Sequence, residues 1–542
     1  MKIIFYLLPL LLLSITFSKD IHIFYSTDLH GYAFPYRDQK THIKYGSLAS
    51  MATILEQRQA DNKSILFFDS GDAFQGTLID RVTQGQLISD ILNDPILSYT
   101  ARVLGNHDFD YGTHITRERF SRSSHPIMAL NIKAKSPIIL DYLHDYALVK
   151  RDGITFGIFG LIDKHTPKNQ IKSNIEGLEF EDETIYVKKM PKFLRDKGAD
   201  VVVMLAHIGF FRTKASPHQH TVSNRPQLLN QILTQDDQDP VHNIDILLDG
   251  HSHDLIYKDY QEDPSSNNDN TIITQAGYYG MHLGELVVSF EGKEIKKVKQ
   301  EFHLLDVKKY PPSKTFLNKF SKLRAQQIKL NQKLVAKVKR GFFLENDMEA
   351  KPQANDAVNL TTQAYYEMAQ SKGMIIDLAF VNVFGVRNHF FSRVGKITYS
   401  MLHKVSPFRN TLQIYDLTGQ QILDILKHKG RRLGFYGAQM SISKEEYLSQ
   451  KDGYSPNSFT FIKDGVHTKL ELNKVYRVIS PNYTAQTDNF LIHKYKKNVE
   501  KTDILDIDAL QSFLKSETKK DPKLSSDKYL LLKDRSLTIT DR

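Results

Sequence analysis

The chain has 542 residues, which is too long for one ordinary hydrophobic core, so two domains are expected. It contains no cysteine, which excludes disulfides, thiolate metal sites and a catalytic thiol, so any metal must be held by histidine, carboxylate or amide groups. Lys and Arg exceed Asp and Glu by 72 − 62 = 10. This positive charge suits anionic small substrates, nucleic acid or an anionic surface, and composition does not choose among them.

The first residues are typical of an export signal. Lys2 precedes an apolar run from Ile3 to Leu13, and the small residues Thr16 and Ser18 stand at positions −3 and −1 of a possible cut before residue 19. The apolar run is short for a bilayer span. We therefore expect residues 1–18 to be a signal peptide. The mature protein is then exported, to a bacterial periplasm or the cell exterior, without a transmembrane anchor.

The first half of the chain repeats one pattern, in which a short apolar run is followed by a polar loop. The runs Ile21–Tyr25 and Ile65–Phe68 flank the segment Tyr45–Gln59, whose apolar residues have helical spacing. This arrangement predicts a β-α-β unit with parallel strands. Ile154–Ile162 is a further buried strand by its near-continuous apolar character. Open α/β sheets place their sites at the carboxyl ends of the strands, so the polar loops are expected to meet there.

Five of these loops carry residue types that bind metals or move protons. They are Ser26–Gly31 with Asp28 and His30, Asp69–Gly76 with Asp72, Gly105–Gly112 with Asn106, His107, Asp108 and Asp110, Ala206–Gly209 with His207, and Asp249–His253 with His251 and His253. A single glycine-bounded polar loop has an alternative interpretation as a surface turn. Five such loops at separate strand ends are hard to explain in that way.

The donor atoms in these loops are sufficient for two divalent cations. The candidate ligands are Asp28, His30, Asp72, Asn106, His207, His251 and His253. Asp72 is the candidate bridge between the two ions. Carboxylate and imidazole donors without sulfur fit Zn, Mn, Co or Fe. Two cations about 3.5–4 Å apart hold a phosphoryl group and generate a hydroxide nucleophile from bound water. His218 and His220, in a polar loop, are expected to be solvated.

The pattern changes at Pro311-Pro312, which ends a first domain expected over residues 19–310. A stripe of apolar residues at helical spacing follows and predicts an interdomain linker helix over residues 311–339. The stripe consists of Phe316, Phe320, Leu323, Leu330 and Leu334. A second α/β region is expected over residues 340–514, and a polar tail over residues 515–542.

The loop motifs resemble a known family. Asp28-x-His30, Gly71-Asp72, Gly105-Asn106-His107-Asp108, His207 and Gly250-His251-x-His253 look like the signature blocks of the calcineurin-like metallophosphoesterases. Gly71–Gly76 and Asn106–Asp110 resemble in particular the exported 5′-nucleotidases, a family that includes periplasmic UDP-sugar hydrolases. This resemblance implies a four-layer α/β metallophosphoesterase sandwich followed by a smaller α/β substrate-binding domain.

The resemblance also implies an activity, the removal of phosphate from nucleotides by attack of metal-bound hydroxide. A 2′,3′-cyclic nucleotide phosphodiesterase/3′-nucleotidase and a UDP-sugar diphosphohydrolase are alternatives of the same chemistry. A surface binding protein without turnover is an alternative of another class, and the presence of every ligand argues against it. A small nucleotide or nucleotide-derived molecule is the expected partner, and no stable nucleic-acid partner is expected.

Specific roles follow from the same resemblance. It implies one ion held by Asp28, His30, Asp72 and His253, and a second held by Asp72, Asn106, His207 and His251. It further implies that His107 and Asp110 form a catalytic dyad. An imidazolium at His107 can stabilise charge on the phosphoryl oxygens, while Asp110 orients it and favours the protonated form. Asp108 is expected to hold the loop or to meet solvent.

The C-terminal half resembles the family's substrate-binding domain more loosely. Asn382–Arg387 aligns with a family Asn-x-Gly-Gly-x-Arg segment in which Phe384 replaces the first glycine, so Arg387 is the candidate binder of phosphate or carboxylate. Two aromatic residues sandwich the nucleobase in the family, and core packing is the alternative for any such residue here. The candidates are Phe435 or Tyr436, and Tyr483, with Asp488 at an acidic family position. The basic cluster Lys427–Arg432 is interpreted as a solvated helix end or as a contact for a polyanionic substrate.

Overall fold

The computed structural model describes most of the chain. The described residues are 19–38, 41–61, 63–136, 139–212, 221–223, 243–258, 271–344, 356–387, 390–392, 395–408, 410–448, 453–463, 465–487, 489–522, 524–525 and 537–540. The predicted signal segment, His218, His220 and Asp488 lie outside them. Within the described ranges, no helix has the length and apolar character needed to cross a membrane.

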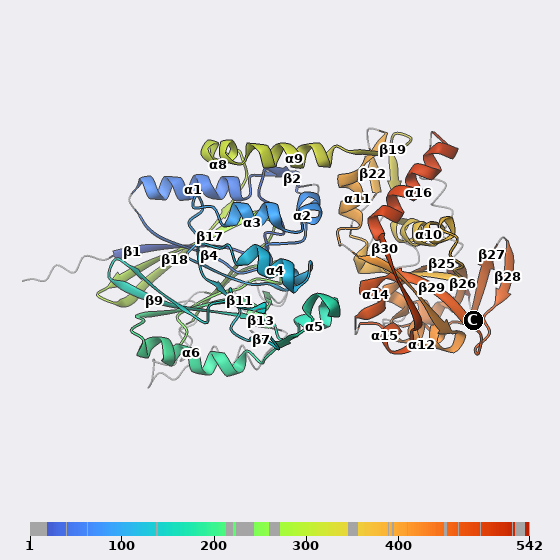
Figure 1. The fold of residues 1–542 in the computed structure, drawn as a ribbon. Coiled ribbons are helices and arrows are strands. Elements are labelled where there is room, and N and C mark those ends of the chain that lie inside the picture. The colour runs from blue at the N-terminus through green and yellow to red at the C-terminus, as the bar shows by residue number, and fades with distance from the viewer. Residues whose placement is uncertain are drawn as a thin grey trace, which may run out of the picture.

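Two six-stranded sheets lie face to face in the N-terminal half (Figure 1). In the first sheet, β1, β4, β5 and β6 are parallel, and β17 and β18 extend it antiparallel from β1. Its order is β18 (Glu294–Leu304), β17 (His282–Glu291), β1 (Lys19–Ser26), β4 (Ser64–Asp69), β5 (Ala101–Val103) and β6 (Ile127–Met128).

The second sheet is parallel in its centre and antiparallel at both edges. Its order is β15 (Leu255–Lys258), β16 (Ile272–Ala276), β14 (Ile246–Leu248), β11 (Val201–His207), β9 (Ile154–Ile162) and β8 (Ala147–Arg151). The predicted strand over Ile154–Ile162 is therefore confirmed as β9. Short antiparallel pairs accompany the sheets, namely β2 (Tyr36–Arg37) with β3 (Lys44–Tyr45), β7 (Ile132–Ala134) with β10 (Leu178–Phe180), and β12 (Phe210–Arg212) with β13 (Thr221–Ser223).

The alternation of side chains along each strand builds four layers. Ile21 and Ile23 of β1 join Val203 of β11 in the core between the sheets, whereas Phe24 points outward to the helices on the first sheet. Met204 likewise points outward and packs with the helix on the second sheet. The outer helices are α1 (Leu48–Ala60), α2 (Leu78–Thr83), α3 (Gln86–Leu92) and α4 (Thr113–Phe120) on one side, and α5 (Thr166–Asn169) and α6 (Thr184–Asp196) on the other.

The linker differs from the single helix predicted over residues 311–339. Two helices, α8 (Lys314–Lys319) and α9 (Ser321–Asn331), meet at Phe320, where φ is −98° and ψ is 21°. Phe316 and Phe320 pack into the N-terminal core, with ring centroids 4.9 Å apart. Leu334 begins β19 (Leu334–Lys337), which pairs with β23 (Lys396–Thr398). The prediction of a single helix from this apolar stripe was therefore wrong, because the last residue of the stripe, Leu334, belongs to a strand of the next domain.

The C-terminal half is built on a five-stranded sheet with helices on both faces (Figure 1). Its order is β25 (Leu433–Tyr436), β21 (Leu378–Asn382), β29 (Val475–Pro481), β24 (Thr411–Thr418) and β30 (Lys497–Leu505). One face packs against α10 and α16, and the other against α12. The helices are α10 (Asp356–Ser371), α11 (Tyr399–Val405), α12 (Gly419–Lys429), α13 (Lys444–Leu448), α14 (Asn482–Gln486), α15 (Ile492–Tyr495) and α16 (Asp506–Lys520).

A four-stranded sheet of order β28 (Val466–Lys469), β27 (Ser458–Lys463), β26 (Ala438–Ser443) and β31 (Leu537–Thr540) adjoins it, and β20 (Phe342–Leu344) pairs with β22 (Phe390–Ser392). The strand β31 runs parallel to β26. The predicted polar tail over residues 515–542 is corrected here, because α16 continues to Lys520 and β31 adds a strand to the sheet.

The two halves meet through α2 and the region of α11. The Arg81 guanidinium donates to the Ser406 carbonyl at 2.8 Å and pairs with Asp506 at 2.9 Å, and all three residues are buried. His403 donates from Nε2 to the Gly76 carbonyl at 3.1 Å. The C-terminal domain thereby contacts the loop that follows β4, which is one of the predicted ligand loops.

Candidate metal centre

The loops that follow β1, β4, β5, β11 and β14 bring the predicted ligands together with an unusual backbone. Five of these ligands have a positive φ, which non-glycine residues rarely adopt. They are Asp28 (50°), His30 (47°), Asp72 (55°), His251 (80°) and His253 (62°). Each such residue costs about 1–3 kcal/mol, and residues of this kind cluster at functional sites. The backbone here is therefore shaped to aim side chains rather than to minimise local strain.

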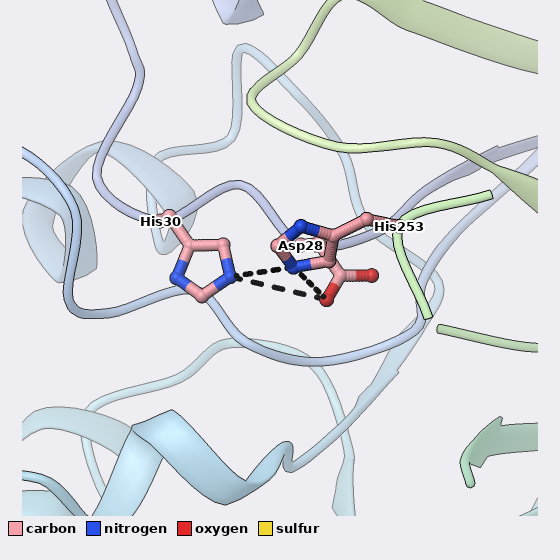
Figure 2. Close-up of side chains that lie close together, drawn as sticks. All are labelled: Asp28, His30 and His253. Atoms are coloured by element: carbon pink, nitrogen blue, oxygen red, sulfur yellow. Dashed lines mark hydrogen bonds and ion pairs between the residues drawn. The ribbon is translucent and has the colours of Figure 1, made fainter. Parts of the chain in front are cut away.

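Asp28, His30 and His253 form the first donor group (Figure 2). The Nε2 atoms of the two histidines lie 3.2 Å apart, and His253 Nε2 lies 3.2 Å from Asp28 Oδ1. His30 donates from Nδ1 to the Phe74 carbonyl at 3.0 Å, so its Nε2 presents a lone pair. Burial lowers the pKa of His30 to about 3, which keeps it neutral. Two ligand nitrogens on a tetrahedral zinc ion, each at about 2.0–2.1 Å, are about 3.3 Å apart, so the group fits a cation.

Asp72, His207 and His251 form the second group, with Asn106 beside them. His207 donates from Nδ1 to the Ser70 carbonyl at 2.7 Å, which leaves its buried Nε2 facing Asp72 Oδ2 at 3.1 Å. That Nε2 makes no well-formed hydrogen bond within the described residues. His251 Nδ1 lies 2.7 Å from Asn106 Oδ1. A buried imidazole nitrogen that faces a carboxylate without a well-formed hydrogen bond is the arrangement that a bound cation would satisfy.

Asp72 lies between the two groups. Its Oδ2 atom is 3.1 Å from His207 Nε2 and 3.7 Å from His30 Nε2, which supports the predicted bridging position. The close approach depends on Gly105, where a Cβ atom would lie 2.1 Å from Asp72 Oδ1. Any larger residue at Gly105 would push the two loops apart.

His107 and Asp110 form a hydrogen-bonded pair at the edge of the two groups. His107 Nδ1 lies 2.9 Å from Asp110 Oδ2, and the His107 amide donates to Asp72 Oδ1 at 2.8 Å. Burial alone would lower the pKa of His107, but the carboxylates of Asp110 and Asp72 outweigh it and raise the pKa to about 9. His107 is therefore an imidazolium at neutral pH, and its charge faces the donor groups.

Two residues that hold Asp110 were missed in the sequence. Gln170 donates from Nε2 to Asp110 Oδ1 at 2.8 Å and to the Asn106 carbonyl at 2.7 Å. Asn174 donates to the Asp110 carbonyl at 2.8 Å. Both lie after β9 in a segment without a strand-end motif, so no sequence signal marks them.

Asp108 holds the loop and does not meet solvent. It is fully buried, and its carboxylate accepts hydrogen bonds from the backbone amides of Ala73 at 3.0 Å, Phe74 at 3.2 Å and Gly105 at 2.8 Å. These bonds fix the loop of the dyad to the loop of Asp72. Asp108 was expected either to hold the loop or to meet solvent, and these contacts indicate that it holds the loop.

Comparisons with known proteins identify the family of the chain. Residues 20–255 match the calcineurin-like phosphoesterase family, and residues 335–494 match the 5′-nucleotidase C-terminal domain family. The chain belongs to the calcineurin-like phosphoesterases that carry a 5′-nucleotidase C-terminal domain. The predicted family and the α/β fold are confirmed, and this family membership makes the chain a metal-dependent phosphoester hydrolase.

Named relatives are distant in sequence but cover most of the chain. The snake venom 5′-nucleotidase of Naja atra is 25% identical over 509 residues, which are 87% of this chain and 90% of that protein. A 5′-nucleotidase of Vibrio cholerae is 23% identical over 508 residues, which are 86% of this chain and 85% of that protein. The crystal structure of a 5′-nucleotidase precursor from Thermus thermophilus superposes with a TM-score of 0.72 at 22% identity, covering 92% of this chain and 96% of that one.

In this phosphoesterase, two candidate residues of the C-terminal domain lie within electrostatic reach of the dyad. Arg387 is exposed, and its positive charge acts on the pKa of both His107 and Tyr279. Burial raises the pKa of Tyr483, and the charges of Arg387 and Asp110 also act on it. Arg387 and Tyr483 therefore lie near the dyad.

The other aromatic candidates lie elsewhere in the phosphoesterase. Phe435 is only 2% exposed and packs against Phe459 with ring centroids 5.6 Å apart, so its ring belongs to the core and is closed to a ligand. Tyr436 packs against Tyr366 with centroids 5.3 Å apart. Both tyrosines line a cavity of about 960 Å³ whose lining includes neither Arg387 nor Tyr483.

The basic cluster is not simply a solvated helix end. The Arg431 guanidinium lies 4.8 Å from the ring centroid of Tyr454, and that of Arg432 lies 5.7 Å from the ring centroid of Phe384. Phe384 belongs to the segment that carries Arg387. Arg432 thus lies beside the segment of Arg387, whereas Lys427 is exposed at the end of α12.

Proposed function

We propose that this phosphoesterase removes phosphate from nucleotides at a centre of two divalent cations. The observation that carries the proposal is the pair of donor groups with Asp72 between them, next to His107, whose pKa is raised to about 9. Asp28, His30 and His253 would hold one ion, and Asn106, His207 and His251 the other. Such a pair of ions lowers the pKa of a bound water toward about 7 and neutralises phosphoryl oxygens.

The protein side chains supply orientation and charge. The His107 imidazolium is placed to donate a hydrogen bond to a phosphoryl oxygen, where negative charge builds up in the transition state. Asp110 keeps His107 protonated and fixes its ring, and Gln170 fixes Asp110 in turn. Because the amide of His107 also donates to Asp72, the dyad and the bridging carboxylate are held in one geometry.

Substrate recognition is assigned to the C-terminal domain. Arg387 offers a guanidinium for an anionic group, and Tyr483 offers an aromatic face for a nucleobase. Relatives that cover most of the chain are named 5′-nucleotidases, which supports a nucleotide monoester as substrate. The apolar run at residues 3–13 supports export of the mature chain.

Phosphate release from AMP by the purified protein, with Mn, Co or Zn added, tests this proposal. We expect turnover with at least one of these metals and two bound ions per chain. Asp72→Asn should lose both turnover and bound metal, because it weakens a ligand common to both ions.

A substrate panel separates the alternatives. A 2′,3′-cyclic nucleotide and a UDP-sugar are assayed beside AMP under the same metal conditions. Rapid cleavage of either one while AMP remains intact would replace the monoesterase assignment by the corresponding diesterase or diphosphohydrolase. Absence of turnover with fewer than two ions bound after reconstitution would favour a binding protein.

A further inference from the structure

His253 is held differently from His30 of its own donor group and from His207 of the second donor group. His30 and His207 each donate from Nδ1 to a backbone carbonyl, which fixes the ring and directs Nε2 at the centre. His253 directs its Nε2 at the same centre, but no partner for its Nδ1 occurs among the described residues. Its side chain is 35% exposed, whereas that of His207 is fully buried.

The remaining ligands of the first group are fixed. Asp28 accepts hydrogen bonds from the Thr27 hydroxyl at 2.5 Å and from the His251 amide at 3.0 Å, and it is fully buried. The geometry of this group therefore varies mainly with the ring of His253, whose Nε2 atom lies close to both the Asp28 carboxylate and His30 Nε2 (Figure 2).

A tyrosine ring takes the place of the missing hydrogen bond. The rings of Tyr278 and His253 are stacked, with centroids 4.9 Å apart and planes inclined by 16°. Such a stacked pair restricts the ring to one plane, as a hydrogen bond from Nδ1 would. Tyr278 is half-buried, so one face of it covers the imidazole and part of it meets solvent.

Tyr278 is itself held by further tyrosines. Its ring meets Tyr279 edge-on at 4.7 Å, and Tyr279 stacks on Tyr32 at 4.5 Å. The Tyr36 hydroxyl donates to the Tyr279 carbonyl at 3.1 Å, and the Tyr279 amide donates to the Asp28 carbonyl at 2.8 Å. The tyrosine stack is therefore tied to the loop of the first donor group and does not move independently of it.

We propose that Tyr278 is a positioning residue that holds the His253 imidazole by ring stacking, and that the ion bound by Asp28, His30 and His253 is the more weakly held of the two. The proposal rests on the two-cation centre proposed above. It follows because His30 and His207 are buried and each is fixed by its second nitrogen, whereas His253 is 35% exposed and is held by ring contacts, of which the stacked one is with Tyr278.

Competition with a chelator tests the proposal on the metal-loaded protein. Zinc is removed stepwise from the wild type and from Tyr278→Leu, the metal content is measured at each step, and anomalous diffraction of partially depleted crystals identifies the site that empties first. We expect the wild type to lose the ion of Asp28, His30 and His253 first. Tyr278→Leu should weaken that ion about 10-fold or more, as loss of an outer-shell partner does, and leave the second ion unchanged.

Two further variants separate positioning from general destabilisation. Tyr278→Phe keeps the ring and removes the hydroxyl, so it should retain the wild-type affinity for both ions. Tyr399→Leu removes another half-buried tyrosine, in the C-terminal domain, and should change neither ion. Thermal unfolding of the metal-free proteins checks that Tyr278→Leu folds.

Three outcomes would overturn the inference alone. They are unchanged zinc affinity in Tyr278→Leu, equal losses in Tyr278→Phe and Tyr278→Leu, and earlier release of the ion near Asn106. Fewer than two ions bound by the wild type would instead overturn the two-cation proposal itself, and this inference with it.

Discussion

Two histidines of the metal centre have opposite protonation although their rings are neighbours. The ring centroids of His30 and His107 lie 5.2 Å apart. Burial lowers the pKa of His30 to about 3, whereas at His107 the charges of Asp110 and Asp72 outweigh burial and raise the pKa to about 9. Environments that separate the pKa values of similar groups assign them different roles. His30 is suited to ligation as a neutral imidazole, and His107 to charge stabilisation as an imidazolium.

This division predicts how substitution of His107 acts. His107→Ala removes the cation next to the phosphoryl position and leaves every proposed metal ligand in place. We expect kcat to fall about 100-fold or more, as for loss of a single charge-stabilising donor. Metal content, measured after reconstitution, should stay at the wild-type level. Loss of both ions in His107→Ala would contradict the assignment, because that result belongs to a ligand such as Asp72.

At the residue scale, the sequence predicted those site residues that have a metal-binding side chain and directly follow a predicted strand. Asp72 follows an apolar run and a glycine, so its place at the sheet edge could be predicted. Gln170 and Tyr278 could not be predicted, because each acts only through a partner that is distant in the sequence. Phe435 and Tyr436 are adjacent on β25 and point to opposite faces of the sheet, and aromatic identity alone does not tell which face is the core.

At the scale of secondary structure, Glu285 joins three strands and a helix. Its carboxylate, on β17, accepts from His22 of β1 at 2.6 Å and from His303 of β18 at 2.6 Å. Arg58 of α1 donates to both carboxylate oxygens at 3.2 Å. Burial would raise the pKa of Glu285, but the hydrogen bonds from His22, His303 and Arg58 outweigh it and hold the pKa well below its usual range.

A lowered pKa makes this cluster a source of stability that depends on pH. The contribution is complete above the unfolded-state pKa of about 4.3 and is lost as the pH falls toward the folded-state pKa. Glu285→Gln should therefore lower the free energy of unfolding by about 2 kcal/mol at pH 7, as for lost hydrogen bonds to a charged group. The difference from the wild type should shrink between pH 5 and pH 3.

Urea unfolding at these pH values measures the effect. Glu294→Gln, an exposed glutamate on β18 that pairs with Lys296 at 2.7 Å, serves as the control and should have no measurable effect. A difference between Glu285→Gln and the wild type that stays constant from pH 7 to pH 3 would contradict the linkage.

Sequence periodicity at this scale identified the strands better than the linker. A near-continuous apolar run predicted β9, and the run is continuous because both faces of that strand are covered. The stripe from Phe316 to Leu334 predicted one helix, but helical spacing does not indicate where the chain leaves the core of one domain and enters that of the next. Phe316 is anchored in the first core and Leu334 in a strand pair of the second domain, so the helix ends between them.

For the whole molecule, the contacts between domains fall into two kinds. Near α9, the domains are joined by the buried pair of Arg81 with Asp506 and by the bond from His403 to Gly76. Beside the proposed active site, burial together with the charges of Lys501 and Lys172 lowers the pKa of Lys496, so Lys496 lies near Lys172. Lys172 belongs to the N-terminal domain and Lys496 to the C-terminal domain. The domains are thus bonded through buried groups beside the linker and meet through basic segments beside the proposed active site.

This asymmetry predicts that the domains open beside the metal centre during turnover, with the contacts near α9 as the pivot. In the proposed mechanism, substrate held by Arg387 and Tyr483 would have to reach ions held by the other domain, and product would have to leave. The chain has no cysteine, so Lys172→Cys with Lys496→Cys introduces the only two thiols. Joining them with bis-methanethiosulfonate reagents of increasing length restricts opening by a set amount. The shortest reagent should lower kcat most, longer ones should restore it, and reduction should return full activity.

Each single variant treated with the same reagents is the control, since it carries the modification without the restraint. Equal kcat at every spacer length would show that turnover needs no opening here.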